Sequence, residues 1–566
     1  MPQAVIPNRT IPILLFVDGL GILFLSIFAS VIGLDPNPDW GPSRFALLAF
    51  GLLWVLVSLY LTWSKKIKFS SSENFKTVFL FAHLWIFVFL VYAWFITYGT
   101  FTTWEKSTRY YAHLADAFSK GQLNVDIVPN VELVEARDPY DSENRPHFDD
   151  EMWDMSLYKE KLYIYWGPVP ALLMLPFQAR SDKLLLDMYL VYGFLCGLFA
   201  INSLLILKLW KRLFSDVPVG NVLAAMFLTA FLLPILWSLN VPDVYEAAIG
   251  AGQFFLMGGI YFAFLAMDTG RKRYLFLAGL FWACSVGSRA INVFSVVFLF
   301  VSVSLWVFRK HSGSLQYWKK SLSSILYLTI PLMLGAILIG AYNWARFGSP
   351  FEFGLRYQIT IYNLNRDSSL SFRPEYFPLN LYAYGLQPFK VISTFPLLRP
   401  VHVSSFLNSL KIAQPKLYAA GSMAGILFST PFLLLSFLPF LSKNRSTVKP
   451  NSTDERQLKK LFLLLVAGSL LINSLIILFY YYGQMRFLVD FISQAALLAV
   501  IGYWELVQRN RASTSKRARA YVHLAHALLV ITLVFSFLLS FTSETQRFEK
   551  FNPTLVEKIN SIFTVQ

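Results

Sequence analysis

Repeated apolar runs are the feature that most constrains the fold of this chain. About thirteen of them are long enough, or nearly long enough, to cross a bilayer core of roughly 30 Å. They lie at approximately 11–34, 45–63, 78–100, 184–207, 219–238, 246–267, 274–288, 291–308, 325–345, 419–441, 460–480, 488–506 and 521–541. Only 14% of the residues are charged and 56% are hydrophobic, which is the composition of a polytopic membrane protein. We therefore expect an all-α fold of about thirteen transmembrane helices with long outer loops.

Lysine and arginine gather in alternate short loops between these runs. When the amino terminus is placed in the cytoplasm, every inside loop is basic, through Lys65, Lys66, Lys68, Lys76, Lys208, Lys211, Arg212, Arg271, Lys272, Arg273, Arg309, Lys310, Lys319, Lys320, Lys443, Arg445, Lys449, Arg456, Lys459, Lys460, Arg509, Arg511, Lys516, Arg517 and Arg519. The short outside connections hold little beyond Arg44, Arg289 and Arg486. This asymmetry predicts a multi-pass protein of the plasma membrane with a cytoplasmic amino terminus. It also accounts for the net charge of +16 without a nucleic-acid partner.

The predicted orientation places two long loops on the outer side. The chain then divides into amino-terminal transmembrane helices, a first outer loop, a transmembrane core, a second outer loop, carboxy-terminal transmembrane helices and an outer tail, at 1–100, 101–183, 184–345, 346–418, 419–541 and 542–566. Segment 167–177 is too short to span, so we expect a helix lying in the membrane interface, with a re-entrant segment as the alternative. Cys196 and Cys284 both lie inside apolar runs and provide neither a disulfide framework nor a metal spacing.

The first outer loop is crowded with carboxylates and aromatic side chains. Its acidic residues include Asp116, Asp126, Glu132, Glu135, Asp138, Asp141, Glu143, Asp149, Asp150, Glu151 and Asp154. Because purely structural membrane loops are usually short, a loop of this length and charge suggests chemistry at the membrane surface.

Three short motifs follow one another in this loop. They are Tyr111 to Ala115, Gly121 to Leu123 and the aromatic-Pro stretch Tyr165 to Pro170. In this order they resemble the C-type (GT-C) integral-membrane glycosyltransferases, near the dolichyl-phosphate-mannose protein mannosyltransferase and aminoarabinose transferase branch. The resemblance implies a GT-C-like fold and transfer of a sugar from a polyprenyl-phosphate donor to an acceptor hydroxyl at the outer face. The acidic pair of that family would fall near Ser107 and Thr108, and neither residue is acidic.

In that family the acidic pair acts as the general base that deprotonates the acceptor hydroxyl. Here we expect another carboxylate of the loop to have this role. A carboxylate that takes this proton contributes roughly 10²–10⁴-fold to the rate. Asp154 adjoins the aromatic-Pro motif that includes Tyr165. Asp138 and Asp141 belong to DPYD, although Asp-Pro is also an ordinary turn former. Asp116 is the fourth candidate.

A divalent cation is a further possibility in this loop. Asp149 and Asp150 precede Glu151, and adjacent acids of this kind can hold a cation through oxygen ligands. A solvated loop explains the same pattern. His113 and His147 lie nearby, but two unpaired histidines are a weak metal signal.

Arginines at the outer membrane face are candidates for binding the donor phosphate. Arg289 ends one apolar run and Arg486 opens another, and both stretches are similar to basic motifs of the GT-C family. A guanidinium can bind phosphate bidentately and offset the charge that builds on the leaving group. The alternatives are snorkelling to the interface and an ion pair between Arg486 and Asp490.

The second outer loop begins with NWARFGSPFEFGLRYQI, in which Arg346, Glu352 and Arg356 lie among aromatics and glycines. Aromatic rings suit the apolar faces of a sugar, and Arg and Glu side chains suit the hydroxyl groups at its rim. A structural turn is equally compatible with this pattern. Tyr245 and Glu246, at the outer start of an apolar run, are expected to join the same cavity.

The sequence therefore predicts a membrane glycosyltransferase. Its expected partners are a lipid-linked sugar donor, a glycan, lipid or protein acceptor, and the bilayer. The alternatives are a transporter or lipid flippase, which would use intramembrane charge and broken helices in paired halves, and a non-catalytic membrane scaffold.

Overall fold

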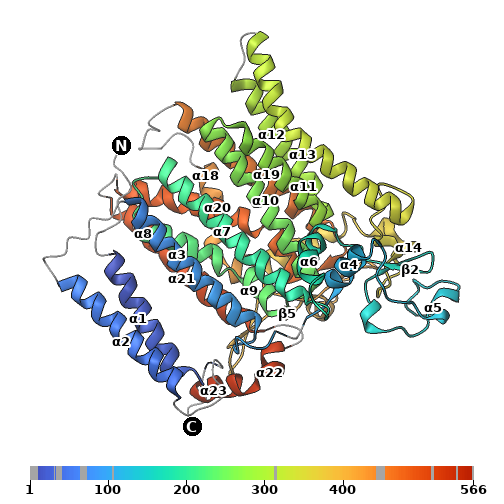
Figure 1. Ribbon diagram of the computed structural model, residues 1–566, viewed down its shortest axis with the longest axis horizontal. Helices are drawn as coiled ribbons and strands as arrows, with labels where there is room; N and C mark the ends of the chain where they lie inside the picture. The colour runs from blue at the N-terminus through green and yellow to red at the C-terminus, as the bar shows by residue number, and fades with distance from the viewer. Residues whose placement is uncertain are drawn as a thin grey trace.

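Long helices lie side by side and make up most of the protein, and the outer loops gather at one end of them (Figure 1). The computed structural model describes residues 10–30, 32, 41–63, 73–104, 107–143, 145–310, 315–441, 453–511, 515–542 and 546–563. The predicted inside-loop residues Lys65, Lys66, Lys68, Lys443, Arg445 and Lys449 lie outside the described residues.

The helical layer follows the apolar runs closely. Its helices are α1 (Thr10–Phe28), α2 (Pro42–Trp63), α3 (Glu73–Ile96), α7 (Asp187–Leu213), α8 (Val219–Ala230), α9 (Leu233–Asn240), α10 (Val244–Thr269), α11 (Lys272–Ser288), α12 (Val293–Lys310), α13 (Leu315–Phe347), α19 (Thr453–Leu478), α20 (Val489–Arg511) and α21 (Lys516–Ser540). In the part of the chain that the structure describes, nine helices are long and apolar enough to cross a membrane. The bent pair α8 and α9, which meet at 43°, would make a tenth. The prediction of a multi-pass helical membrane protein is confirmed.

The count of thirteen spans is not confirmed. Helix α11 has only 17 residues. The run predicted at 419–441 is not one helix but a series of short pieces, namely β6 (Ala419–Ala420), β7 (Ser422–Met423), α17 (Ile426–Ser429), the 3₁₀ helix η6 (Pro431–Phe437) and α18 (Leu438–Leu441). Pro431 and Pro439 lack the backbone N–H that a continuous helix would need at these positions.

Helix α20 lies at the centre of the helical layer. It packs against α19, α10, α21 and η6, and its side chains from Val489 to Trp504 are buried. Helices α1 and α2 instead pack mainly on each other, at the edge of the molecule beside α3 (Figure 1). Because α20 begins at Val489, the residues just before it lie at the outer end of the most buried helix.

Short elements gather at the end of the helices where the predicted outer loops lie. The helices among them are α4 (Tyr110–Ser119), α5 (Val131–Glu135), η1 (Asp150–Met152), α6 (Val169–Gln178), η2 (Ala290–Asn292), η3 (Leu355–Tyr357), α14 (Leu364–Asp367), η4 (Ser368–Leu370), α15 (Tyr376–Leu381), η5 (Tyr382–Leu386), α16 (Val403–Ser409), η7 (Met485–Leu488), α22 (Arg547–Phe551) and α23 (Pro553–Phe563). The remaining strands are β1 (Ser156–Tyr158), β2 (Lys161–Tyr163), β3 (Lys390–Val391), β4 (Leu398–Arg399), β5 (Val401–His402) and β8 (Tyr482–Gly483). Every sheet among the described residues is two-stranded, and β6 pairs with β8 in parallel, which ties the segment just after the second outer loop to the segment before α20.

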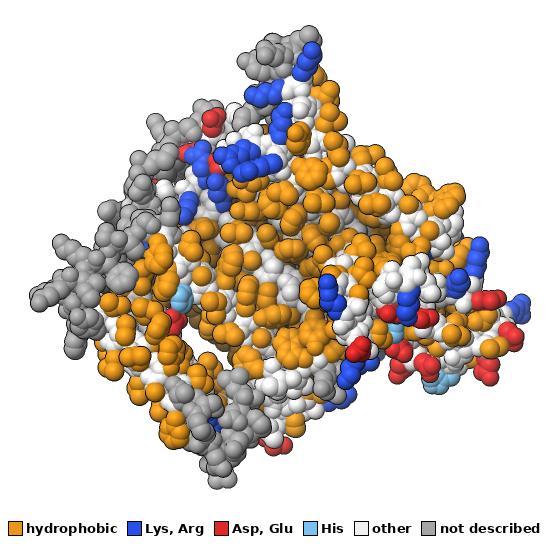
Figure 2. All heavy atoms as spheres, in the orientation of Figure 1, with side chains coloured by type: hydrophobic (Ala, Val, Ile, Leu, Met, Phe, Trp, Pro, Cys, Tyr) orange, Lys and Arg blue, Asp and Glu red, His pale blue; other side chains and the backbone are white. Residues whose placement is uncertain are grey.

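Apolar side chains cover the face over the helices, whereas acidic side chains concentrate over the outer loops (Figure 2). The segment predicted to lie in the interface contains α6, a ten-residue helix that packs against α4. Leu172, Leu173 and Phe177 of α6 are exposed, which suits a helix at a membrane surface.

Candidate functional site

Five charged side chains from distant parts of the chain lie where α10 and α20 begin and α11 ends, on the side of the two long loops. Asp154 comes from the first outer loop, Glu246 from α10, Arg289 from the end of α11, Arg486 from η7 and Asp490 from α20. Arg289 pairs with Asp490, and Arg486 lies near Glu246 and interacts electrostatically with Asp154. Phe487 connects the two sets, because both guanidinium groups lie against its ring. This group is called the charged cluster below.

Arg486 is held by contacts that leave part of its guanidinium unused. Its guanidinium carbon lies 4.0 Å from the centre of the Tyr245 ring, and its Nη1 lies 3.7 Å from Oε1 of Glu246. Arg486 Nε and Glu246 Oε2 are buried and have no hydrogen-bond partner among the described residues. A desolvated guanidinium with donor capacity to spare is suited to binding an anion.

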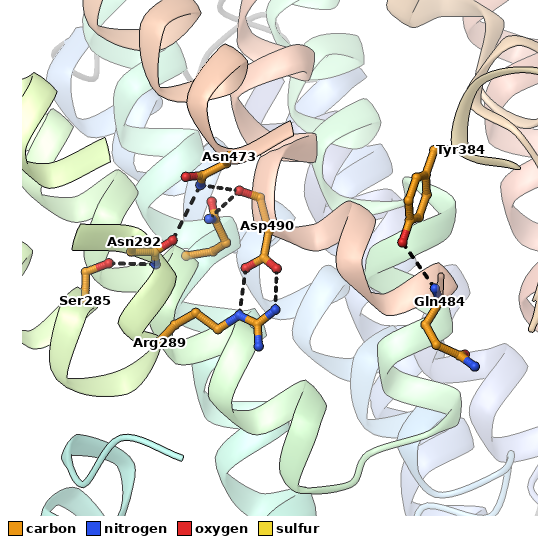
Figure 3. Close-up of polar contacts among 8 residues, drawn as sticks. Ser285, Arg289, Asn292, Tyr384, Asn473, Gln484 and Asp490 are labelled. Atoms are coloured by element: carbon orange, nitrogen blue, oxygen red, sulfur yellow. Dashed lines mark hydrogen bonds and ion pairs between the residues drawn. The ribbon is translucent and has the colours of Figure 1, made fainter. Parts of the chain in front are cut away.

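Asp490 pairs with Arg289, so the alternative pairing of Arg486 with Asp490 is wrong. Arg289 Nη2 and Nε donate to Oδ2 and Oδ1 of Asp490, at 2.8 and 3.3 Å (Figure 3). The backbone carbonyl of Asp490 also accepts bonds from the side-chain amides of Gln253 and Asn473, at 2.6 and 2.7 Å. These bonds hold the backbone of Asp490, and its carboxylate in turn fixes the orientation of the Arg289 guanidinium.

A buried amide network supports this ion pair (Figure 3). Asn473 donates to Asn292 at 3.5 Å, and Asn292 donates to Ser285 at 3.0 Å. Gly252 of α10 lets Arg289 approach closely, since a Cβ there would lie 2.7 Å from the Cβ of Arg289. No motif in the sequence marks these residues as part of a site, although an asparagine inside an apolar run is a detectable signal.

Of the four carboxylates predicted as candidates for the general base, Asp154 is the one that lies in the charged cluster. It is only 6% exposed, and its Oδ1 has no hydrogen-bond partner among the described residues. Burial raises the pKa of Asp154 from 3.8 to about 6, although Thr360, Arg486 and Arg145 pull it downward. Its φ of +61° is unusual for a residue other than glycine, and its N–H donates to the Ile359 carbonyl at 2.9 Å. Backbone strain of this kind concentrates at functional sites.

Two tyrosines interact electrostatically with Asp154 and with both arginines. Burial raises the pKa of both Tyr165 and Tyr480, the charge of Asp154 acts in the same direction, and Arg289 and Arg486 oppose it. Each tyrosine is therefore close to the carboxylate and to both guanidinium groups. Their neutral hydroxyls are available to donate hydrogen bonds in the space that these charges share.

The aromatic-Pro segment reaches this space because it packs directly on the end of α11. A Cβ at Gly167 would collide with the backbone carbonyl of Gly287, so only glycine fits there. This close approach places Tyr165 beside Arg289.

A carboxylate from another part of the chain, that of Asp187, lies at Thr108, where the family's acidic pair is missing. Thr108 donates to Asp187 at 2.6 Å, and the backbone N–H groups of Tyr110 and Tyr111 donate to the same carboxylate at 2.9 and 3.0 Å. Asp187 is fully buried and caps α4. The backbone N–H of Val244 donates to Thr108, which ties α4 to the start of α10. These bonds give Asp187 a positioning role.

The other three predicted carboxylates lie in the outer loop away from these contacts. Asp116 pairs with Lys120 at 2.8 Å. Asp138 accepts a bond from Asn363 at 2.8 Å. Asp141 is half-buried and interacts electrostatically with Arg145.

The predicted residues of the second outer loop have partners within the protein. Arg346 is 4% exposed and donates to the Ile164 carbonyl at 2.6 Å and to Asn343 at 2.7 Å, so it braces the aromatic-Pro segment. Glu352 pairs with Arg356 at 2.8 Å. The structure places these three side chains outside the charged cluster.

Asp149 and Asp150 are exposed. In the described part of the chain, no group of three or more His, Cys, Asp and Glu side chains is arranged to hold a metal ion. His113 instead contacts Glu151 at 3.0 Å. A cation at Asp149 and Asp150 stays a prediction.

An apolar groove begins beside the charged cluster. This cavity of about 1160 Å³ lies between α12, α13 and the end of α19, and its lining includes Val286, Ala290, Phe294, Gly340, Trp344 and Phe479. Ala290 follows Arg289 in the chain, and Phe479 precedes Tyr480. Two lining residues of the groove are therefore chain neighbours of polar residues of the site.

Comparisons with known proteins give distant structural matches. No family model and no curated protein matches the chain. Three solved structures of the oligosaccharyltransferase from Archaeoglobus fulgidus do: the apo form, a complex with an inhibitory peptide and a dolichol-phosphate, and a form tethered to an acceptor peptide containing the NVT sequon. They are 15%, 14% and 15% identical, with TM-scores of 0.40, 0.42 and 0.43, and cover 82%, 82% and 84% of this chain.

The chain spans only 57%, 56% and 56% of those proteins. At these TM-scores the likeness assigns neither a fold family nor an activity to this protein. Its own structure defines a multi-pass helical membrane protein with a buried charged site at one end of the helices.

Proposed function

We propose that the protein is a GT-C-type glycosyltransferase of the plasma membrane. It moves a sugar from a polyprenyl-phosphate donor to a hydroxyl of a glycan, lipid or protein acceptor at the outer face. The observation that carries this proposal is the buried carboxylate of Asp154, which has an unused oxygen, interacts with Arg486, and shares two neighbouring tyrosines with Arg486 and Arg289.

Asp154 serves as the general base. Its Oδ1 accepts the proton of the acceptor hydroxyl while the acceptor oxygen bonds to the anomeric carbon of the sugar. The bond between that carbon and the phosphate oxygen breaks, and the electron pair leaves with the polyprenyl phosphate. A base of pKa about 6 is mostly ionised at neutral pH and still basic enough to assist this step.

The arginines stabilise the departing phosphate. Arg486 has an unused Nε, and Tyr245 and Glu246 hold its guanidinium in place. Arg289 is neutralised in part by Asp490, so it directs a weaker positive charge to the same space. Fixed charges in a desolvated site stabilise developing negative charge without reorganisation.

The apolar groove supports a lipid-linked donor. Its lining is apolar and includes Ala290 and Phe479, the chain neighbours of Arg289 and Tyr480. An isoprenoid chain lying there would place its phosphate at the charged cluster. A flippase would have no need for a base with an unused oxygen beside the phosphate.

Purified protein in lipid nanodiscs tests this proposal. Labelled polyprenyl-phosphate sugars are supplied with and without acceptor extracts, and sugar transfer or release is measured for the wild type and for Asp154→Asn. We expect transfer of one donor class by the wild type and a loss of at least about 10²-fold in the variant. Movement of intact donor across the membrane without sugar transfer would favour the flippase alternative.

A further inference from the structure

The last described segment of the chain, residues 546–563, docks against the outer ends of α3 and α10. Phe548 of α22 is 1% exposed and packs against Trp94 and Phe95. Asn552 donates from its side-chain amide to the Tyr98 carbonyl at 2.8 Å. These contacts place α22 beside the end of α3.

Arg547, the first residue of α22, forms an ion pair with Asp243. Its Nη1 also donates to the Tyr98 hydroxyl at 3.2 Å. Asp243 immediately precedes α10, and its side chain makes no capping bond to that helix. The carboxylate that would ordinarily cap α10 is therefore used to bind the tail.

Asp243 precedes Glu246 by three residues, so two carboxylates lie on the first turn of α10. Glu246 interacts electrostatically with Arg486, with Asp243 and with Arg547. Without Arg547, the charge of Asp243 would lack its ion-pair partner and would add to that of Glu246 in attracting Arg486. If the Arg486 guanidinium is drawn toward Asp243 and Glu246, fewer of its N–H groups are available to donate to a ligand.

We propose that Arg547 is a positioning residue: it neutralises Asp243 and so keeps Arg486 available to the donor phosphate. The inference rests on the proposed function and extends the site to Arg547, which lies 61 residues after Arg486 in the chain. Arg547 acts through Asp243 and Arg486 and needs no contact with the substrate.

The test measures the affinity of the full-length protein for a polyprenyl monophosphate, with the matching polyprenol as the headgroup control. Arg547→Ala should weaken binding of the monophosphate about tenfold, and Arg547→Lys, which keeps the charge, about threefold or less. Asp243→Asn introduced into Arg547→Ala should restore binding to within about threefold of the wild type, because it removes the uncompensated charge. If Arg547→Ala folds poorly, Arg547→Gln takes its place.

Asn552→Ala is the matched control, because it loosens the tail at Tyr98 and leaves Asp243 paired. It should stay within about twofold of the wild type. If it weakens binding as much as Arg547→Ala, or if Asp243→Asn restores nothing, the tail acts only as a structural anchor and the proposal is overturned.

These measurements also separate the two proposals. A wild type that binds the monophosphate but transfers no sugar refutes the proposed function and leaves the comparison of Arg547 variants decisive. A wild type that binds monophosphate no better than polyprenol overturns both.

Discussion

Replacing Asp154 with asparagine should abolish most activity and yet stabilise the protein. The two side chains have nearly the same shape, and asparagine tolerates the left-handed backbone conformation found at this position. The substitution therefore removes the charge and the proton acceptor while it keeps the packing. A residue retained for packing alone would not show opposite effects on activity and stability.

The size of the stability gain follows from the pKa. Burial raises the pKa of Asp154 from 3.8 to about 6. At about 1.4 kcal/mol for each pKa unit, the ionised carboxylate costs the folded protein about 3 kcal/mol. The folded state holds the proton more tightly than the unfolded state, so this cost is absent below about pH 4, grows as pH rises, and is complete above about pH 6.

Thermal unfolding of the wild type and Asp154→Asn across this pH range is the assay. The two melting temperatures should agree near pH 4, and the variant should become the more stable one by pH 7, while its turnover at pH 7 falls at least about 10²-fold. Equal turnover, or a variant that is less stable at pH 7, would refute the assignment of Asp154 as a buried base.

Other predictions address the remaining parts of the site and the orientation. Arg486→Ala should weaken donor binding about tenfold to a hundredfold, and Arg486→Lys by less, as donor titrations would show. Asp490→Asn should destabilise the protein by about 3–5 kcal/mol, measured by unfolding, because a buried arginine loses its partner. Ala290→Trp should fill the groove and raise the KM for a long-chain donor more than for a short-chain analogue in the transfer assay. Reporter fusions at 443–458 and 101–183 should read cytoplasmic and external, and both reading the same side would contradict the orientation.

Hydropathy located most helices but not every break in them. The run at 219–238 contains Pro234, and the chain bends just before it because the residue preceding a proline disfavours helical geometry. The run at 419–441 contains two prolines and forms short pieces. The average hydropathy of a window does not detect the backbone N–H that a proline lacks, and so it does not show where a helix breaks.

The charged residues of the site were predictable, but one of their pairings was not. Charges at the outer ends of apolar runs are scarce, which singled out Arg289, Arg486 and Glu246. The alternative pair of Arg486 with Asp490 would suit a continuous helix, in which residues four apart share a face. The 3₁₀ helix η7 intervenes, and the partner of Asp490 comes from a segment 201 residues away.

Arg547 had no signal in the sequence that would connect it to the site. Its role depends on a tail folding back onto α10, and no periodicity or motif encodes that contact.

A structure determined with a polyprenyl monophosphate bound tests the central claim most directly. The account predicts the phosphate within hydrogen-bond distance of Arg486, close to Arg289 and across from Asp154, with the isoprenoid chain in the groove lined by Ala290 and Phe479. A phosphate bound away from Arg486, or a chain lying outside that groove, would contradict it.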